Sequence, residues 1–328
     1  MSSPEKPTIS IVIVSWNAKS FLAECLESLQ GPVYDGPMET IVVDNGSSDG
    51  SAEMVRARFS DVKLICNESN LGFAKANNIG IRRCQGEFVA LINSDVHVLP
   101  GCLSSLVSYC EAYPRAGLVG PYIKGGDGAQ QISCRAAPTV WNMFCRALAL
   151  DAVFDRSRLF NGYFLGHWDH STVGPVDILS GCFWLARRAA LDEVGLLDEA
   201  FFFYGEDMDW CKRFRDTGWG VDFVPQARAI HYGGASSANS PIRFYIERQK
   251  ADLQYWRKHH SSLSVLAYYA ICVLNHALRV IGYSAKARVA GRDKETSRYK
   301  VRRSAACLRW LFTVESAPQG SSGEEPIS

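Results

Sequence analysis

The sequence predicts an α/β protein with a mostly parallel sheet covered by helices on both faces, followed by a helical extension near the C-terminus. Apolar runs rich in β-branched residues alternate with helical patterns over the first hundred residues, which predicts the sheet. Polar residues directly follow several of these runs. A strongly apolar stretch at 263–282, followed by a basic segment, predicts the extension.

The first hundred residues show strands and helices in alternation. The expected strands are 9–17, 39–51 with its polar turn, 63–67 and 87–93. The expected helices are 21–29, which stops at Gly31, then 55–59 and 77–84. Ligands of such sheets gather at the carboxyl ends of the strands. Asn17, Asp44 and Asp95 all lie at these predicted ends, and this recurrence is the first functional signal.

The remaining chain is less regular up to residue 175 and contains a glycine-rich loop at 125–128. Beyond it we expect a strand leading into a helix at 177–191, then an aromatic run, an acidic turn and a helix at 201–219. A strand pair at 220–234 and a helix at 242–260 follow. The polar tail is expected to be disordered.

Composition limits the function classes. The 328 residues are 47% hydrophobic, which suits one large core or two smaller ones, and the net charge of +1 gives no bias toward nucleic acid. Eleven scattered cysteines without a CxxC pair fit neither a zinc site nor a disulfide framework, and they fit a reducing cytosol. The opening MSSPEKPT lacks the apolar core of a secretory signal. We therefore expect a cytoplasmic protein.

Two stretches allow both a structural and a ligand-binding interpretation. Asp44, in VVDNGSSDGS, suits an Asx-type turn, and it also suits a carboxylate that accepts a hydrogen bond from a nucleobase. The stretch NLGFAKANNIG at 70–80 suits an ordinary helix start, or backbone N–H groups that bind a phosphate. It matches neither the P-loop nor the dinucleotide pattern.

Asn93-Ser94-Asp95 interrupts the apolar run FVALINSDVHVLPG. A buried lone carboxylate is costly, so Asp95 lies at an open strand end or meets a cation. Mg²⁺ and Mn²⁺ are typically held by one or two carboxylates together with substrate phosphates. The alternative is a capped turn before Pro100. His231, in AIHYGG, is likewise either a structural histidine or a second metal ligand beside glycines.

Glu206 and Asp207 begin a predicted helix after FFFYG. Acidic residues at a helix N-terminus are favoured by the helix dipole, which is explanation enough for the pair. The alternative is a general base held rigidly by the apolar residues that anchor the helix. Asp209 and Arg213, four residues apart, suggest a surface ion pair.

The chain resembles the family 2 glycosyltransferases and, within them, the bacterial rhamnosyltransferase-like enzymes. The resemblance covers roughly residues 8–258 and rests on motifs in the family's order: SWN, VVDNGSSDGS, NLGFAKANN, LINSDV, SGCFWLARR, FFYGEDMDWCKR and IHYGG. It implies a GT-A fold, a Rossmann-like arrangement with a nucleotide-sugar-binding half at 1–100 and an acceptor-binding, catalytic half at 101–260. A helical extension at 261–312 and a disordered tail at 313–328 complete the expected organisation.

The resemblance also implies roles for individual residues. Asp207 matches the catalytic base, with Glu206 supporting it, and Asp95 and His231 match the ligands of Mg²⁺ or Mn²⁺. Gly181 and Cys182 lie where the acceptor segment begins. The donor-binding positions are Ser15, Asn17, Asp44, Asn70, Gly72, Asn78, Asn93 and Ser94. Asn93 replaces the first carboxylate of the DxD-type motif, which we interpret as reduced charge compensation at the metal.

The activity implied is an inverting, metal-dependent transfer of a sugar to a hydroxyl of a saccharide, or of a polyprenyl-diphosphate-linked saccharide, in cell-wall or surface-polysaccharide assembly. Family similarity favours dTDP-L-rhamnose as the donor, and UDP- or GDP-linked sugars are the alternatives. A sugar-phosphate nucleotidyltransferase is the rival enzyme, but its glycine-rich GGxGTRL opening is missing from ISIVIVSWNAKS. A non-catalytic sugar-nucleotide-binding protein is the rival from another class.

The extension bears on the acceptor. Residues 263–278 are uncharged, but Asn275, His276 and Arg279 interrupt the apolar pattern. A full span needs about 20 apolar residues, so we expect an interfacial helix, whose basic continuation suits the anionic headgroups of the inner face of the membrane. The basic residues are Lys286, Arg288, Arg292, Lys294, Arg298, Lys300, Arg302 and Arg303. The alternative is a helical hairpin packed on the catalytic domain.

Overall fold

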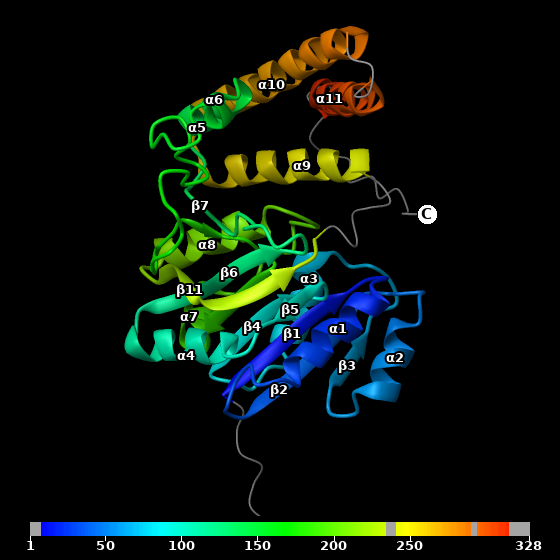
Figure 1. Ribbon diagram of the computed structural model, residues 1–328, viewed down its shortest axis with the longest axis vertical. Coiled ribbons are helices and arrows are strands. Elements are labelled where there is room, and N and C mark those ends of the chain that lie inside the picture. Colours follow the sequence, from blue (N-terminus) through cyan, green and yellow to red (C-terminus); the bar gives the residue numbers. More distant parts are fainter. Residues whose placement is uncertain (1–7, 234–240, 290–293, 315–328) are drawn as a thin grey trace, which may run out of the picture.

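One large sheet, covered by helices on both faces, forms the lower part of the molecule, and a helical layer lies at the opposite end (Figure 1). The computed structural model describes residues 8–233, 241–289 and 294–314. The sheet contains nine strands in the order β3-β2-β1-β4-β10-β6-β11-β5, and β8 pairs with β11. The predicted tail at 313–328 lies almost wholly outside the described residues, as does Arg292.

The first half of the sheet is parallel, as predicted. Its strands are β1 (Ile9–Ser15), β2 (Met38–Asp44), β3 (Lys63–Cys66) and β4 (Phe88–Asn93). β1 pairs in parallel with β2 and β4, and β2 with β3. The helices between them are α1 (Lys19–Leu29), α2 (Ser51–Arg58) and α3 (Phe73–Ile81). α3 begins earlier than the predicted 77, because Gly72 turns the chain at φ +84° just before Phe73.

The second half of the sheet is mixed. Its strands are β5 (Val96–Val98), β6 (Ala116–Gly125), β8 (Gly174–Pro175), β10 (Phe183–Arg187) and β11 (Gly220–His231). β10 runs antiparallel to β4 and β6, β6 and β11 are parallel, and β5 and β8 are antiparallel to β11. The predicted strand pair at 220–234 is wrong. β11 is a single strand. Its pairing with β6 shifts register between Val224 and Arg228, and Pro225 in this irregular stretch has the sequence pattern of a turn.

The sequence analysis missed β6, since glycines and a proline in AGLVGPYIKG conceal a buried strand. The remaining elements lie around the sheet and in the helical layer. They are α4 (Cys102–Ala112), β7 (Cys134–Arg135), α5 (Val140–Ala147), α6 (Leu150–Val153), β9 (Ile178–Leu179), α7 (Arg188–Val194), α8 (Glu206–Asp216), α9 (Pro241–His259), α10 (Ser262–Val289) and α11 (Lys294–Val314).

Alternate side chains of the strands fill two cores. Ile11 and Ile13 of β1 pack with residues of α1 and α4, whereas Val12 packs on the other face with residues of α3, α7 and α8. A third core joins α5, α9 and α10 and includes Trp256 and Tyr268, whose rings stack at 4.5 Å. α9 thus packs with the helical layer although it precedes residue 261. The division of the chain into domains at 261 stays a prediction.

Candidate functional site

The polar strand ends predicted from the sequence meet at one edge of the sheet. Ser15 pairs with Asp44 across β1 and β2, and Val14 pairs with Asn93 across β1 and β4. The backbone N–H of Asn93 donates to Cys182 O at 2.9 Å, which brings the segment before β10 to the same edge. Parallel register therefore places these positions side by side.

Two buried oxygen atoms at this edge have no partner among the described residues, Ser15 Oγ and Asp44 Oδ1. The other oxygen of Asp44 accepts a hydrogen bond from Ser47 N–H at 3.1 Å. Asp44 thus closes a turn with one oxygen, as the first interpretation predicts, and its other oxygen has no partner among the described residues, so nucleobase binding stays a prediction. Buried oxygen atoms without a hydrogen-bond partner are rare in proteins, and a ligand that donates hydrogen bonds would supply the partners.

Asn45 is a residue that sequence reasoning missed. Its Nδ2 group donates to Asn70 Oδ1 at 2.9 Å and to Gly72 O at 3.3 Å, while its Oδ1 accepts from Leu71 N–H at 3.1 Å. The amide therefore fixes the loop before α3 next to Asp44. Asn45 directly follows Asp44 at the end of a strand, and this position could have identified it from the sequence.

Three other donor-binding predictions meet different surroundings. Asn17 lies on the rim with φ +50°, and its Oδ1 accepts from Ser48 N–H at 2.8 Å. Asn78 is buried, and its amide bonds the backbone of Leu197 in both directions and reaches Glu199 Oε1 at 3.0 Å. Ser94 is buried beside Asp95. The amide of Asn78 is therefore used to hold a neighbouring loop.

Asp95 and His231, 136 positions apart in the chain, come together at the β5–β11 edge. Asp95 Oδ1 lies 3.2 Å from His231 Nε2. Neighbouring ligands of an octahedral Mg²⁺ ion lie about 3 Å apart, as follows from bond lengths of about 2.1 Å. The pair therefore fits a divalent ion. Within the described ranges, no group of three or more His, Cys, Asp and Glu side chains could hold a metal, so metal binding by this pair stays a prediction.

Gln131, which the sequence analysis did not single out, orients His231. His231 Nδ1 donates to Gln131 Oε1 at 2.6 Å. In the neutral tautomer with its proton on Nδ1, the lone pair is on Nε2, the nitrogen that faces Asp95. Gln131 lies in the loop after β6, and nothing in the local sequence marks it.

The acidic pair begins α8 after a left-handed turn. Tyr204 has φ +70° and Gly205 has φ +84°, and a Cβ on Gly205 would lie 2.9 Å from the Phe201 ring. Glu206 is buried, with Oε2 lacking a partner among the described residues, whereas Asp207 forms an ion pair with Arg135. Burial, and then the adjacent Asp207 charge, raise the pKa of Glu206 well above its usual value. Of the two, Asp207 is the carboxylate with a cationic partner.

Gly181 and Cys182 lie near the two carboxylate centres. A Cβ on Gly181 would lie 3.6 Å from Glu206 Oε1. Burial raises the pKa of the Cys182 thiol to about 12, with smaller contributions from the negative charges of Asp95 and Asp207. The segment between β9 and β10 thus lies close both to the candidate metal ligand Asp95 and to the candidate base.

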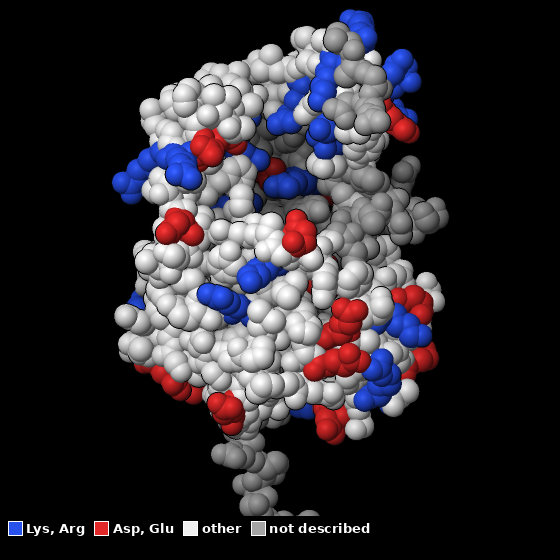
Figure 2. All heavy atoms as spheres, in the orientation of Figure 1, with Lys and Arg blue, Asp and Glu red and all other residues white. Residues whose placement is uncertain are grey.

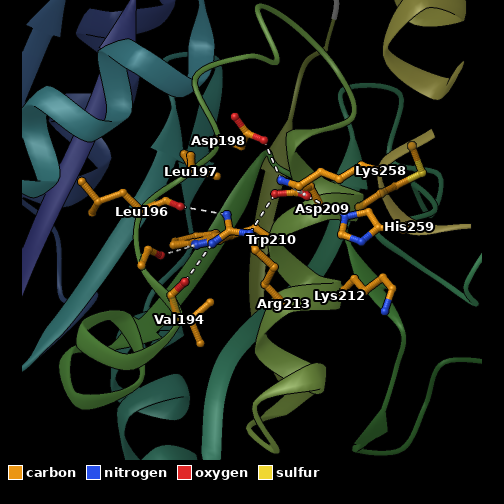
Figure 3. A network of polar contacts seen from close by, with 12 residues as sticks. Val194, Leu196, Leu197, Asp198, Asp209, Trp210, Lys212, Arg213, Lys258 and His259 are labelled. Carbon is orange, nitrogen blue, oxygen red and sulfur yellow. Dashed lines mark hydrogen bonds and ion pairs between the residues drawn. The ribbon is translucent and has the colours of Figure 1, made fainter. Parts of the chain in front are cut away.

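The predicted ion pair between Asp209 and Arg213 forms, at 2.9 Å, but its predicted surface location is wrong. Asp209 is fully buried at the centre of a network that also contains Lys258 and His259 from α9 (Figure 3). Arg213 bridges Asp209 to the carbonyl oxygens of Val194 and Leu196, at 2.9 and 2.8 Å. Helical spacing alone could not show that α9 covers this face of α8. The network fixes α8, and hence Glu206 and Asp207, against two other segments.

Asp209→Asn is expected to lower the free energy of unfolding at pH 7 by about 3–5 kcal/mol, because Arg213, Lys258 and His259 lose the buried carboxylate with which all three pair. Burial alone would raise the pKa of Asp209, but hydrogen bonds from His259 and Lys258 and the charge of Arg213 lower it to about 2. A lowered folded-state pKa means stabilisation of about 2 kcal/mol that is present above about pH 4 and lost as the pH falls toward 2.

Urea unfolding between pH 7 and pH 2.5, roughly the window of that titration, measures both effects. Asp216→Asn is the matched control, since Asp216 lies on the same helix in an exposed pair with Lys212 and should change stability by less than about 1 kcal/mol. Equal stability of the two variants would contradict the central role of Asp209.

The chain is similar to known proteins. The family model "Glycosyl transferase family 2" matches residues 10–195. The chain is 30% identical over 264 residues to N-acetylglucosaminyl-diphospho-decaprenol L-rhamnosyltransferase of Mycobacterium tuberculosis, covering 77% of this chain and 85% of that protein. It is 29% identical over 238 residues to the pre-mycofactocin glycosyltransferase of the same organism, covering 70% and 44%.

Solved structures share the fold. The mannosyltransferase PcManGT from Pyrobaculum calidifontis, in complex with GDP-Man and Mn²⁺, matches with a TM-score of 0.57 at 17% identity, covering 97% of this chain and 89% of that one. GalNAc-T7 with UDP, GalNAc and Mn²⁺ matches with a TM-score of 0.52 at 16% identity, covering 95% and 57%. The predicted GT-A fold with a C-terminal helical extension is confirmed.

Proposed function

The chain belongs to glycosyl transferase family 2, and from that premise we propose that it transfers L-rhamnose from dTDP-L-rhamnose to a hydroxyl of a lipid-linked saccharide. The rhamnosyltransferase of M. tuberculosis, whose name specifies an N-acetylglucosaminyl-diphospho-decaprenol acceptor, supports this donor and this acceptor class. A transfer of this kind belongs to cell-wall or surface-polysaccharide assembly at the cytoplasmic face of the membrane.

The observation that carries the chemistry is the arrangement of Asp95, His231 and Asp207 around one short segment. The first two lie 3.2 Å apart, and Asp95 and Asp207 are both close enough to Cys182 for their charges to raise the pKa of its thiol. A divalent ion, Mg²⁺ or Mn²⁺, held by Asp95 and His231 would supply positive charge beside the departing diphosphate. Asp207, which pairs with Arg135, is the group that we propose to receive the proton.

The reaction is an inverting displacement. Asp207 takes the proton of the acceptor hydroxyl, and the hydroxyl oxygen forms a bond to the anomeric carbon from the side opposite the nucleotide. The bond between that carbon and the diphosphate oxygen breaks, and dTDP leaves with the electron pair. Glu206, neutral at pH 7 because burial raises its pKa, supports the base without competing for the proton.

The donor contacts follow from the strand-end edge. Ser15 Oγ and Asp44 Oδ1, both buried and unpartnered among the described residues, bind the nucleoside. Asn17, Asn70, Gly72, Asn93 and Ser94 line the rest of the donor pocket. Asn78 positions this wall through the loop at 197–199, because its amide is already hydrogen-bonded there. Gly181 and Cys182 begin the acceptor side.

The test is a transfer assay that follows nucleoside diphosphate release from dTDP-rhamnose, UDP-sugars and GDP-sugars, with a short-chain N-acetylglucosaminyl diphospholipid as acceptor and Mn²⁺ present. We expect acceptor-dependent release from dTDP-rhamnose alone. Turnover of a UDP- or GDP-sugar instead would show that this chain uses one of those donors and would contradict dTDP-rhamnose. A thermal shift with dTDP-rhamnose but no release from any donor, with or without acceptor, would identify a non-catalytic binding protein.

A further inference from the structure

The outward face of α10 is apolar from end to end. Its exposed large hydrophobic side chains are Leu263, Leu266, Leu274, Leu278 and Ile281, with exposed fractions of 77, 62, 37, 40 and 67%. Their spacings of three, eight, four and three residues keep them on one helical face. α10 also has the length and composition of a membrane span: its most apolar window of 18 residues has a mean hydropathy of 1.5, and only 11% of that window is buried.

The polar residues that interrupt the apolar sequence of α10 lie on its inner side. His276 Nε2 lies 3.0 Å from Gln249 Oε1 of α9, and Arg279 Nε donates to Asn275 Oδ1 at 2.8 Å. Burial, with the charge of Arg279, lowers the pKa of His276 to about 4, so this side chain is neutral inside the helical layer. The helix thus turns polar groups inward and leucines outward, the reverse of a helix that faces water.

A second apolar element lies beside the start of α10. The α5–α6 region packs on α10 and carries more exposed hydrophobic side chains (Figure 1). They are Trp141 (47%), Leu148 (39%), Val153 (69%), Phe154 (47%) and Leu159 (60%). No residue of α6 is buried. Because α5 contacts α10, the two apolar elements belong to one end of the molecule, away from the sheet.

Positive charge borders this apolar surface. Arg288 at the end of α10 and Lys294, Arg298 and Arg302 of α11 are exposed, and Figure 2 shows Lys and Arg side chains gathered at this end of the helical layer. Among the residues that the structure describes, these four form no ion pair with an acidic side chain. A basic border around exposed leucines matches the chemistry of an anionic lipid surface.

We propose that α10 and the α5–α6 region together form a membrane-docking surface, which lies in the headgroup region of an anionic bilayer without crossing it. A crossing helix would expose its whole circumference to lipid. In contrast, Tyr268 and Cys272 are buried in the helical layer, and His276 is hydrogen-bonded to α9. The proposal is independent of the donor sugar, because it concerns attachment rather than transfer.

Flotation of the full chain with lipid vesicles tests the proposal without any activity measurement. We expect binding to phosphatidylcholine vesicles that contain phosphatidylglycerol and much weaker binding to phosphatidylcholine alone. The triple variant Leu266→Glu, Leu274→Glu, Ile281→Glu should bind at least about tenfold more weakly. Val153→Glu with Phe154→Glu should show a smaller loss. Tyr113→Glu, on an equally exposed side chain after α4, is the matched control and should bind like the wild type.

The folded state of each variant is checked by circular dichroism, since the substituted side chains are all solvent-exposed. Wild-type protein that stays unbound with anionic vesicles, or a triple variant that binds like the control, would overturn the proposal. Retention on the vesicles after an alkaline wash would overturn the interfacial orientation in favour of a span. A wild-type dimer that the triple variant converts to a monomer, without vesicle binding by either, would assign the surface to self-association.

Discussion

Asp207→Asn is expected to lower kcat by about 10²–10⁴-fold while donor binding stays unchanged. Asparagine keeps the shape and the hydrogen-bonding positions of the side chain but cannot accept a proton at neutral pH. Binding stays intact because the strand-end residues that we propose for the donor belong to other elements. The measurements are single-turnover transfer rates and a thermal shift with dTDP and Mn²⁺.

Glu206→Gln separates the roles of the two carboxyl groups. Glutamine mimics the neutral acid that burial favours at position 206, so this variant should lose less than about tenfold in rate. Asp216→Asn, on the exposed side of α8, is the control for general effects on the helix. A large loss with Glu206→Gln and a small one with Asp207→Asn would make Glu206 the base. Loss of donor binding with Asp207→Asn would make Asp207 structural.

The sheet was predictable from the sequence where local pattern and final environment agree. β1, β2 and β4 are buried on both faces, so their apolar runs predict the strands. The polar residues at their ends predict the edge that carries Asp44 and Asn93. β6 was missed because its glycines and proline are strand breakers locally, although Gly117 and Gly120 are needed where Trp219 and Leu179 pack closely.

The supporting residues of the site could not be predicted because their function depends on tertiary contacts. Gln131 meets His231 across 100 positions of the chain, and Asp209 meets His259 across 50. Arg135 reaches Asp207 from a two-residue strand that carries no sequence signal. A glutamine in a loop and an i, i+4 ion pair are common in any sequence, so only the fold identifies them as parts of the site.

Asp95→Ala is expected to weaken Mn²⁺-dependent binding of dTDP by at least about 10²-fold. The variant removes the only charged member of the two-residue ligand pair, and nothing else of acidic character lies close enough among the described residues to replace it. Titration of Mn²⁺ by calorimetry in the presence of dTDP measures the loss. Binding of dTDP without metal should fall much less, because Ser15 and Asp44 are unchanged.

Gln131→Leu provides a graded test of the same centre. Both ligands remain, but His231 loses the acceptor that fixes its Nδ1 proton, and losses of such supporting hydrogen bonds typically cost 10–100-fold in metal affinity. Asp127→Ala, in the exposed turn near Gln131, removes a carboxylate outside the pair and should leave affinity unchanged. Equal Mn²⁺ affinity in Asp95→Ala and Asp127→Ala would mean that the ion binds elsewhere. If Mn²⁺ affinity falls in Asp95→Ala but not in Gln131→Leu, Asp95 is a ligand and the hydrogen bond from His231 to Gln131 does not contribute to metal binding.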